Sequence, residues 1–214
     1  MKKAPLIFLI LSLSTISLIA QNSTWKSDQP HSKVSFSISH MVISEVSGRF
    51  NDFEASMIQT KDDLSDSKLT ATIKVKSIDT DNESRDKHLK SADFFDAEKY
   101  PEILFDSKSF EKTGKDTYKI TGDLTMHGFT KPIVLDTKFN GFINDPWGNM
   151  RAGFKATGKL NRKDFDIKYN KIIEAGGLLI GENVDFTINM EMVKQMSRPI
   201  VAYRHGRLTG RRAK

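Results

Sequence analysis

The stretch Val34-Ser35-Phe36-Ser37-Ile38-Ser39-His40 alternates bulky side chains with serines. A period of two is that of a β-strand with one apolar and one polar face. The same alternation returns in ranges 69–76, 133–139, 151–159 and 184–192, and further strands are expected at 46–58, 101–110 and 117–127. These strands, about eight in number, predict an all-β domain, an eight-stranded antiparallel barrel able to hold one small ligand. A β-sandwich is the alternative for the same pattern.

One polar and aromatic run interrupts the strands, Arg85-Asp86-Lys87-His88-Leu89-Lys90-Ser91-Ala92-Asp93-Phe94-Phe95. Positions within it recur at helical spacing, and Thr80 with Glu83 forms a capping-box pattern ahead of it. We therefore expect a short helical insertion near 81–97 on the rim of the barrel.

Residues 1–20 have the pattern of a cleaved signal peptide. Lys2 and Lys3 precede an apolar run from Leu6 to Leu13, and Ala20 offers a small residue for cleavage. The run is too short for a membrane span. We expect an exported protein, located in the periplasm or secreted. Because the sequence has no cysteine, the exported domain must rely on core burial instead of disulfides, and thiol chemistry is excluded.

The net charge of +6 is unevenly distributed. Without Lys2, Lys3 and the seven basic residues of 194–214, the segment 21–193 has a net charge of −3. A nucleic-acid partner is therefore not expected for the domain at 21–193. The basic tail, 194–214, is expected to be disordered, and its functional interpretation is contact with an anionic membrane surface.

Several short motifs follow one another over roughly 25–192. They are Trp25, Asp28-Gln29-Pro30-His31-Ser32, Phe36, His40, Val46-Ser47-Gly48-Arg49-Phe50, Phe53, Ser77-Ile78-Asp79-Thr80, the run Arg85 to Phe95, Tyr100-Pro101, Phe105, Ser107, Gly122-Asp123-Leu124-Thr125, Gly128-Phe129-Thr130-Lys131-Pro132, Asn161-Arg162 and Asp164-Phe165. Each motif alone is weak. Their order and spacing resemble the YceI-like family of secreted, lipocalin-like polyisoprenoid-binding proteins.

The resemblance implies an antiparallel barrel that encloses an elongated apolar channel for an isoprenoid chain, such as a polyprenyl phosphate or a quinone with a long tail. It implies a lipid carrier with no catalytic residues and no cofactor beyond the bound lipid. One departure is Asp166, which stands where the family pattern usually has glycine. An exact match of the family's backbone is therefore in question there.

Burying a prenyl chain gains roughly 25 cal/mol for each Å² of apolar surface removed from water, so the lining needs few polar groups. The sequence leaves open whether the inward aromatic side chains line a hollow barrel or fill its core. The candidate lining residues are Phe36, Ile38, Phe50, Phe53, Ile73, Val75, Phe105, Leu124, Leu135, Phe139, Phe154 and Phe186.

A phosphate head group at the mouth of the channel would favour cationic partners. Arg85 and His88 lie on one face of the expected helix, and Arg162 is a third candidate. The alternative is structural: Arg85 pairs with a nearby carboxylate and His88 packs as a half-buried polar residue.

The sequence bears on two other classes of function. A metal centre or hydrolase built on His31, His40 or His88 is not expected, because the sequence has no HExxH motif and no Gly-x-Ser-x-Gly elbow. A non-enzymatic interaction module with a filled barrel, acting through its rim and basic tail, is the main alternative to a lipid carrier. An exposed sheet edge would also allow a homodimer.

Overall fold

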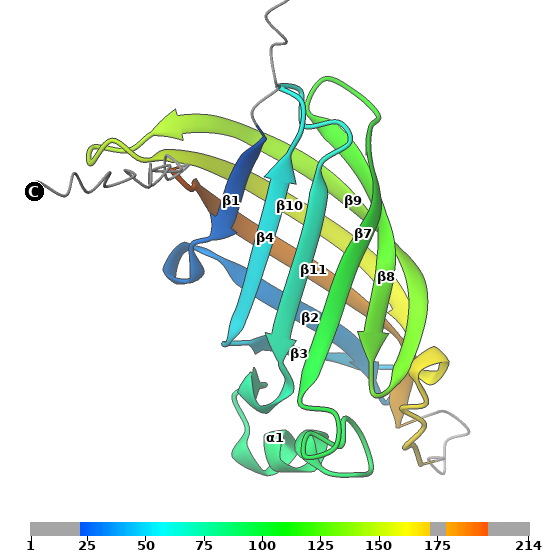
Figure 1. The fold of residues 1–214 in the computed structure, drawn as a ribbon. Coiled ribbons are helices and arrows are strands. Elements are labelled where there is room, and N and C mark those ends of the chain that lie inside the picture. Colours follow the sequence, from blue (N-terminus) through cyan, green and yellow to red (C-terminus); the bar gives the residue numbers. More distant parts are fainter. Residues whose placement is uncertain (1–21, 172–178, 197–214) are drawn as a thin grey trace, which may run out of the picture.

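The computed structural model describes residues 22–171 and 179–196, which form a single sheet of eleven strands with one α-helix (Figure 1). The expected signal peptide at 1–20 and positions 197–214 of the basic tail lie outside the described residues. The elements are β1 (Ser23–Ser27), η1 (Gln29–His31), β2 (Lys33–His40), β3 (Ser44–Phe50), β4 (Phe53–Gln59), β5 (Lys68–Lys74), η2 (Val75–Ser77), β6 (Ile78–Asp79), α1 (Glu83–Lys90), β7 (Glu102–Lys112), β8 (Thr117–Met126), β9 (Phe129–Asn144), β10 (Met150–Asn161), η3 (Arg162–Phe165) and β11 (Ile180–Lys194), where η denotes a short 3-10 turn.

Eight of the strands close into a barrel in the order β1-β4-β5-β7-β8-β9-β10-β11, and β11 pairs back to β1. Every neighbouring pair in this ring is antiparallel. The expected eight-stranded antiparallel barrel is therefore confirmed. The β-sandwich alternative is wrong, because β1 bonds to both β4 and β11 and so joins what would be two open edges.

The long strand β11 has two successive partners along one edge. Ile188 pairs with Val34 of β2, whereas Met192 pairs with Ser27 of β1. Strand β2 continues β1 after the turn η1, and β3 and β6 follow it in the sheet. The wall of the barrel is therefore extended beside β11 by the β2–β3 hairpin.

Two expected strands are interrupted. The range 46–58 forms two strands, β3 and β4, which are separated at Asn51 and Asp52, and the range 69–76 ends as a strand at Lys74. Backbone hydrogen bonds join the two breaks: the N–H of Asn51 donates to Ser77 O and that of Lys74 donates to Asp52 O. The breaks thus satisfy each other's backbone groups while the chain turns.

The expected helical insertion is confirmed as α1, which with the loop after it lies across one end of the barrel (Figure 1). Its N-cap is Asn82, whose side chain accepts a hydrogen bond from the N–H of Arg85. Thr80 does not cap the helix. Its N–H and hydroxyl donate to the Asp86 carboxylate instead, which fastens the start of α1 to the preceding strand β6. No helix within 22–171 and 179–196 is long and apolar enough to span a membrane.

The opposite end of the barrel is filled with side chains. Trp25 is completely buried there and stacks on Phe142, with ring centroids 5.3 Å apart. Met57, which pairs with Trp25, and Met192, which pairs with Ser27, are also buried. The barrel therefore has one end closed by its own core and one end covered by α1.

Candidate functional site, an apolar cavity inside the barrel

The interior of the barrel contains a cavity of about 760 Å³. Its wall is formed by side chains from both the barrel strands and the α1 segment, and most of them are aliphatic or aromatic. A volume of this size lies within the usual range for small-molecule sites. The barrel is thus hollow along part of its length. The interaction-module alternative assumed a filled barrel, and the barrel is not filled throughout.

Two phenylalanine rings of the cavity wall lie over glycines of neighbouring strands. A Cβ atom built on Gly48 would lie 2.4 Å from Cζ of Phe36, and one on Gly158 would lie 2.3 Å from Cζ of Phe186. In both cases the phenylalanine and the glycine are paired across adjacent strands. The rings occupy the space that a side chain at the glycine would need, so they cover the wall instead of crossing the interior.

Nine of the twelve candidate lining residues reach this cavity. They are Phe36, Ile38, Phe50, Ile73, Phe105, Leu124, Leu135, Phe154 and Phe186. That these side chains contact a lipid stays a prediction.

The other three candidates lie in the protein away from the cavity wall. Phe53 is the first residue of β4 and Val75 is in η2, so both are buried where the alternation of their strands is interrupted. Phe139 packs against Phe142 and Phe154, with ring centroids 4.7 and 5.3 Å away. It belongs to the aromatic cluster at the filled end, next to an irregularity in the β9–β10 pairing at Gly153 and Phe154.

Several lining residues were not among the candidates. Some had a signal in the sequence: Met190 and Met192 share the alternation of Phe186 in β11, and Phe94 and Phe95 belong to the aromatic run after α1. Tyr169 had none, because it follows η3 in a segment without regular strand pairing. It is brought to the cavity by its contact with His88, whose ring centroid lies 4.8 Å away.

All three head-group candidates line the cavity. The Arg85 side chain is held by Thr80: Nε donates to the hydroxyl at 2.8 Å and Nη2 donates to the carbonyl at 2.7 Å. His88 forms a 3.1 Å contact between Nε2 and Oδ2 of Asp93. Arg85 is therefore held by a threonine, not by the carboxylate that the structural alternative expected, and its contact with a head group stays a prediction.

Arg162 is the most buried of the three, with 3% of its surface exposed. Its Nε donates to Gly181 O at 2.8 Å and its Nη1 donates to Ile167 O at 2.7 Å. Its Nη2 is buried and has no hydrogen-bond partner among the described residues. Burial lowers the pKa of this guanidinium, but arginine remains protonated at any physiological pH.

The turn after η3 explains how Ile167 reaches Arg162. Asp166 has φ 61° and ψ 15°, the left-handed conformation that glycine favours and that aspartate tolerates. The chain reverses there, so that the N–H of Ile167 donates to Arg162 O at 3.2 Å while Ile167 O accepts from Nη1. The departure at Asp166 therefore leaves a glycine-like backbone in place.

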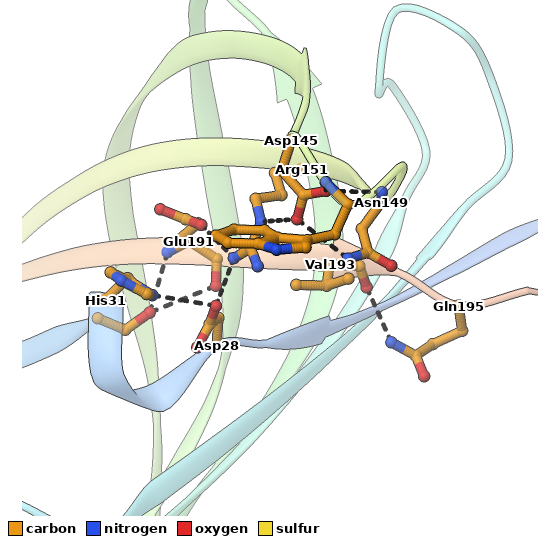
Figure 2. A network of polar contacts seen from close by, with 10 residues as sticks. Asp28, His31, Asp145, Asn149, Arg151, Glu191, Val193 and Gln195 are labelled. Atoms are coloured by element: carbon orange, nitrogen blue, oxygen red, sulfur yellow. Dashed lines mark hydrogen bonds and ion pairs between the residues drawn. The ribbon is translucent and has the colours of Figure 1, made fainter.

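A second polar feature, at η1, is a network centred on Arg151 (Figure 2). Nε of Arg151 contacts Oδ2 of Asp145 at 2.7 Å, and Nη1 contacts both Asp28 Oδ2 and Glu191 Oε1. The hydrogen bond from Arg151 is the main reason that the pKa of Asp28 is lowered. Burial alone would raise the pKa of Asp145, but hydrogen bonds from Arg151 and from residues of the same loop outweigh it and hold that pKa below its usual range.

This network also contains the histidine and carboxylates closest to a metal-binding arrangement in the described part of the chain. Donor atoms of Asp28, His31 and Glu191 lie within 4.8 Å of one another. The guanidinium of Arg151 already supplies the positive charge that these carboxylates face, so the geometry is that of an ion-pair network. His40 and His88 line the cavity, apart from this group.

Comparisons with known proteins agree with this architecture. A family model described as YceI-like domain matches residues 25–192. Protein YceI of Escherichia coli O157:H7 is 40% identical over 190 residues, which cover 89% of this chain and 96% of that protein. The crystal structure of a Campylobacter jejuni YCEI protein is 35% identical, with a TM-score of 0.64, and the match covers 74% of this chain and 91% of that one.

A polyisoprenoid binding domain from Saccharophagus degradans, implicated in plant cell wall breakdown, has the same fold. Its TM-score is 0.59 at 14% identity, and the match covers 80% of this chain and 98% of that domain. Because the family model spans the barrel from Trp25 to Met192 and a relative 40% identical covers most of the chain, this protein belongs to the YceI-like family.

Proposed function

We propose that this protein is a non-enzymatic lipid-binding protein that encloses the chain of a polyisoprenoid, such as a polyprenyl phosphate or an isoprenoid quinone, in the barrel cavity. The observation that carries the proposal is the apolar cavity of about 760 Å³, open within a barrel whose far end is closed. The name of the Saccharophagus degradans domain, which shares the fold, supports the same class of ligand.

The physical basis of binding is apolar burial. Binding a branched hydrocarbon chain gains roughly 25 cal/mol of free energy for each Å² of its surface that leaves water. Because the Phe, Ile, Leu and Met side chains of the wall are apolar, the chain needs no hydrogen bonds there. At roughly 30 Å³ for each water-sized group, the cavity of about 760 Å³ holds on the order of 25 non-hydrogen atoms, or about five isoprene units.

The proposal includes an extracytoplasmic location, in the periplasm or outside the cell, which the pattern of residues 1–20 supports. It also includes contact of the basic tail with an anionic membrane. Strand β11 ends at Lys194 on the side of the barrel away from α1 (Figure 1). Removal of 195–214 is therefore expected to weaken binding to anionic vesicles without altering the cavity.

Native mass spectrometry of the purified protein, followed by organic extraction, tests the lipid proposal. We expect an adduct whose mass identifies a prenyl chain, or binding of added polyprenyl phosphate or quinone. Ala156→Phe should abolish the adduct, because Ala156 lines the cavity and a phenyl ring there occupies ligand space.

The matched control is Thr157→Phe, which introduces the same side chain at the next position of β10, where it points to the outer face. It should bind lipid as the wild type does. A wild-type protein that neither carries a lipid nor takes up an added prenyl lipid would contradict the proposed function.

A further inference from the structure

Arg162 is a buried cation without an acidic partner among the described residues. Glu182, the carboxylate whose charge acts on it, forms an ion pair with Lys163, and Asp166 pairs with Lys168. The two contacts of Arg162 itself are neutral backbone carbonyls. Buried charges in proteins are ordinarily paired, because an uncompensated charge in a low-dielectric interior is costly.

The geometry limits how a ligand could compensate this charge. Nε and one N–H of Nη1 are already bonded to Gly181 O and Ile167 O, whereas Nη2 has no hydrogen-bond partner among the described residues. A two-pronged contact with a carboxylate or phosphate uses two guanidinium nitrogens, and both of the other nitrogens here already bond to backbone carbonyls. Nη2 therefore suits one oxygen of a ligand, and the positive charge favours an oxygen that is anionic over a hydroxyl or a ketone.

The position of Arg162 fixes which end of a ligand it would meet. It opens η3, which lies at the same end of the barrel as α1 (Figure 1). The aromatic contact between Tyr169 and His88 links the segment after η3 to α1. The filled end, with Trp25, lies at the other end of the cavity.

Resting on the proposed function, we propose that Arg162 is the head-group anchor of the cavity: its Nη2 donates a hydrogen bond to an anionic oxygen of a prenyl lipid, so that the protein selects prenyl phosphates over the corresponding alcohols. The phosphate lies at the α1 end and the chain extends towards Trp25. Arg162 supplies selectivity for the head group, whereas the apolar wall supplies most of the affinity.

An equimolar competition between all-trans geranylgeranyl phosphate and geranylgeraniol, measured by native mass spectrometry, tests this assignment. The two ligands share one chain, so their ratio reports the head group alone. A hydrogen bond to a charged group predicts that the wild type prefers the phosphate on the order of 10- to 100-fold. Arg162→Met should bring the ratio to about one while geranylgeraniol still binds.

Lys163→Met is the matched control, since it removes the neighbouring cation of η3, which is exposed and bonded to Glu182. It should keep the wild-type ratio. If Arg85→Met removes the preference and Arg162→Met does not, the anchor is Arg85 and the proposal is overturned.

Arg162→Met also removes two hydrogen bonds to the backbone, so a measurement on the wild type is needed beside it. With ¹⁵N-labelled arginine, the phosphate but not the alcohol should shift a guanidinium signal that is missing in Arg162→Lys. A wild type that binds both ligands equally well would overturn the anchor and leave lipid binding intact. A wild type that binds neither would instead contradict the proposed function.

Discussion

Gly158 controls the width of the cavity through its contact with Phe186. The ring of Phe186 lies over it, and a Cβ at this position would be 2.3 Å from Cζ of that ring. In Gly158→Ala the ring must swing away from the wall into the cavity. Excluding about two ligand carbons, at about 0.8 kcal/mol each, should weaken binding of geranylgeranyl phosphate on the order of tenfold, as measured by the dissociation constant.

Gly153→Ala is the control for this prediction, because Gly153 lies on the same strand and the nearest atom to its Cβ, in Asn140, would be 3.4 Å away. Its affinity should equal that of the wild type. If Gly158→Ala folds and binds normally, the ring of Phe186 does not define the wall in solution.

The turn between β2 and β3 carries backbone strain. Met41 and Val42 have φ values of 54° and 66°, and Ile43 N–H donates to His40 O at 3.3 Å. Both central residues of the turn from His40 to Ile43 therefore have positive φ, an arrangement that strongly favours Asn-Gly, whereas a left-handed conformation costs other residues roughly 1–2 kcal/mol each. The double substitution Met41→Asn and Val42→Gly should therefore stabilise the protein by about 1–2 kcal/mol.

Chemical denaturation measures this prediction as a higher midpoint at an unchanged slope. The reverse order, Met41→Gly with Val42→Asn, is a useful comparison because it places the same two residues in the less favoured sequence. An unchanged midpoint in both variants would mean that the turn is not left-handed in solution.

The Arg151 network fixes η1 between β1 and β2. The guanidinium contacts Asp28, which directly precedes η1, Asp145 of the β9–β10 loop and Glu191 of β11 (Figure 2). The pKa values of Asp28 and Asp145 are lowered in the folded state. Carboxylates with lowered pKa values stabilise the fold above their unfolded pKa near 4, and this stabilisation is lost as the pH falls through the folded value.

Arg151→Met should consequently lower the melting temperature by several degrees at pH 7 and by less near pH 2, where protonation of Asp28 and Asp145 in the unfolded chain has removed much of this stabilisation. Melting curves of the variant and the wild type across this interval provide the measurement. Lys159→Met is the control, since its ion pair with Asp185 is exposed and should contribute little at either pH. An equal loss at both pH values would show that Arg151 acts through packing.

The extent to which the sequence predicted these elements has a physical explanation. Alternation reports which face of a strand points inward, and so it identified the wall residues of long uninterrupted strands such as Phe154 and Phe186. It does not report depth along the barrel, and so it also included Phe139, which lies at the filled end. It failed at Val75 because η2 ends the strand.

The hydrogen-bond partners of polar side chains were harder to predict from the sequence than the residues of the cavity wall. Arg151 and Asp28 are separated by 123 positions, and only the closure of the barrel brings them together. Arg162 was a candidate from its type and motif, but its burial depends on the carbonyls of Gly181 and Ile167, which the chain reaches through the reversal at Asp166.

At the scale of the molecule, the barrel cavity is closed at the end away from α1; this closed end is called the floor below. Trp25 fills the end away from α1, and Met57 lies beside it on the cavity wall. A chain that enters from the α1 end therefore has a limited depth to occupy. Affinity should rise with each isoprene unit that the cavity can enclose and then level off at about five units, the capacity at roughly 30 Å³ for each non-hydrogen atom.

A series of prenyl phosphates from farnesyl to octaprenyl, titrated under one set of conditions, gives the position of this plateau. Met57→Ala should move it to longer chains, because the substitution deepens the floor. Met126→Ala removes the same side chain from the cavity wall at the end of β8 nearest α1, and should leave the plateau in place. Affinity that keeps rising up to octaprenyl in the wild type would show that the chain passes the floor, and the filled end would then have to open on binding.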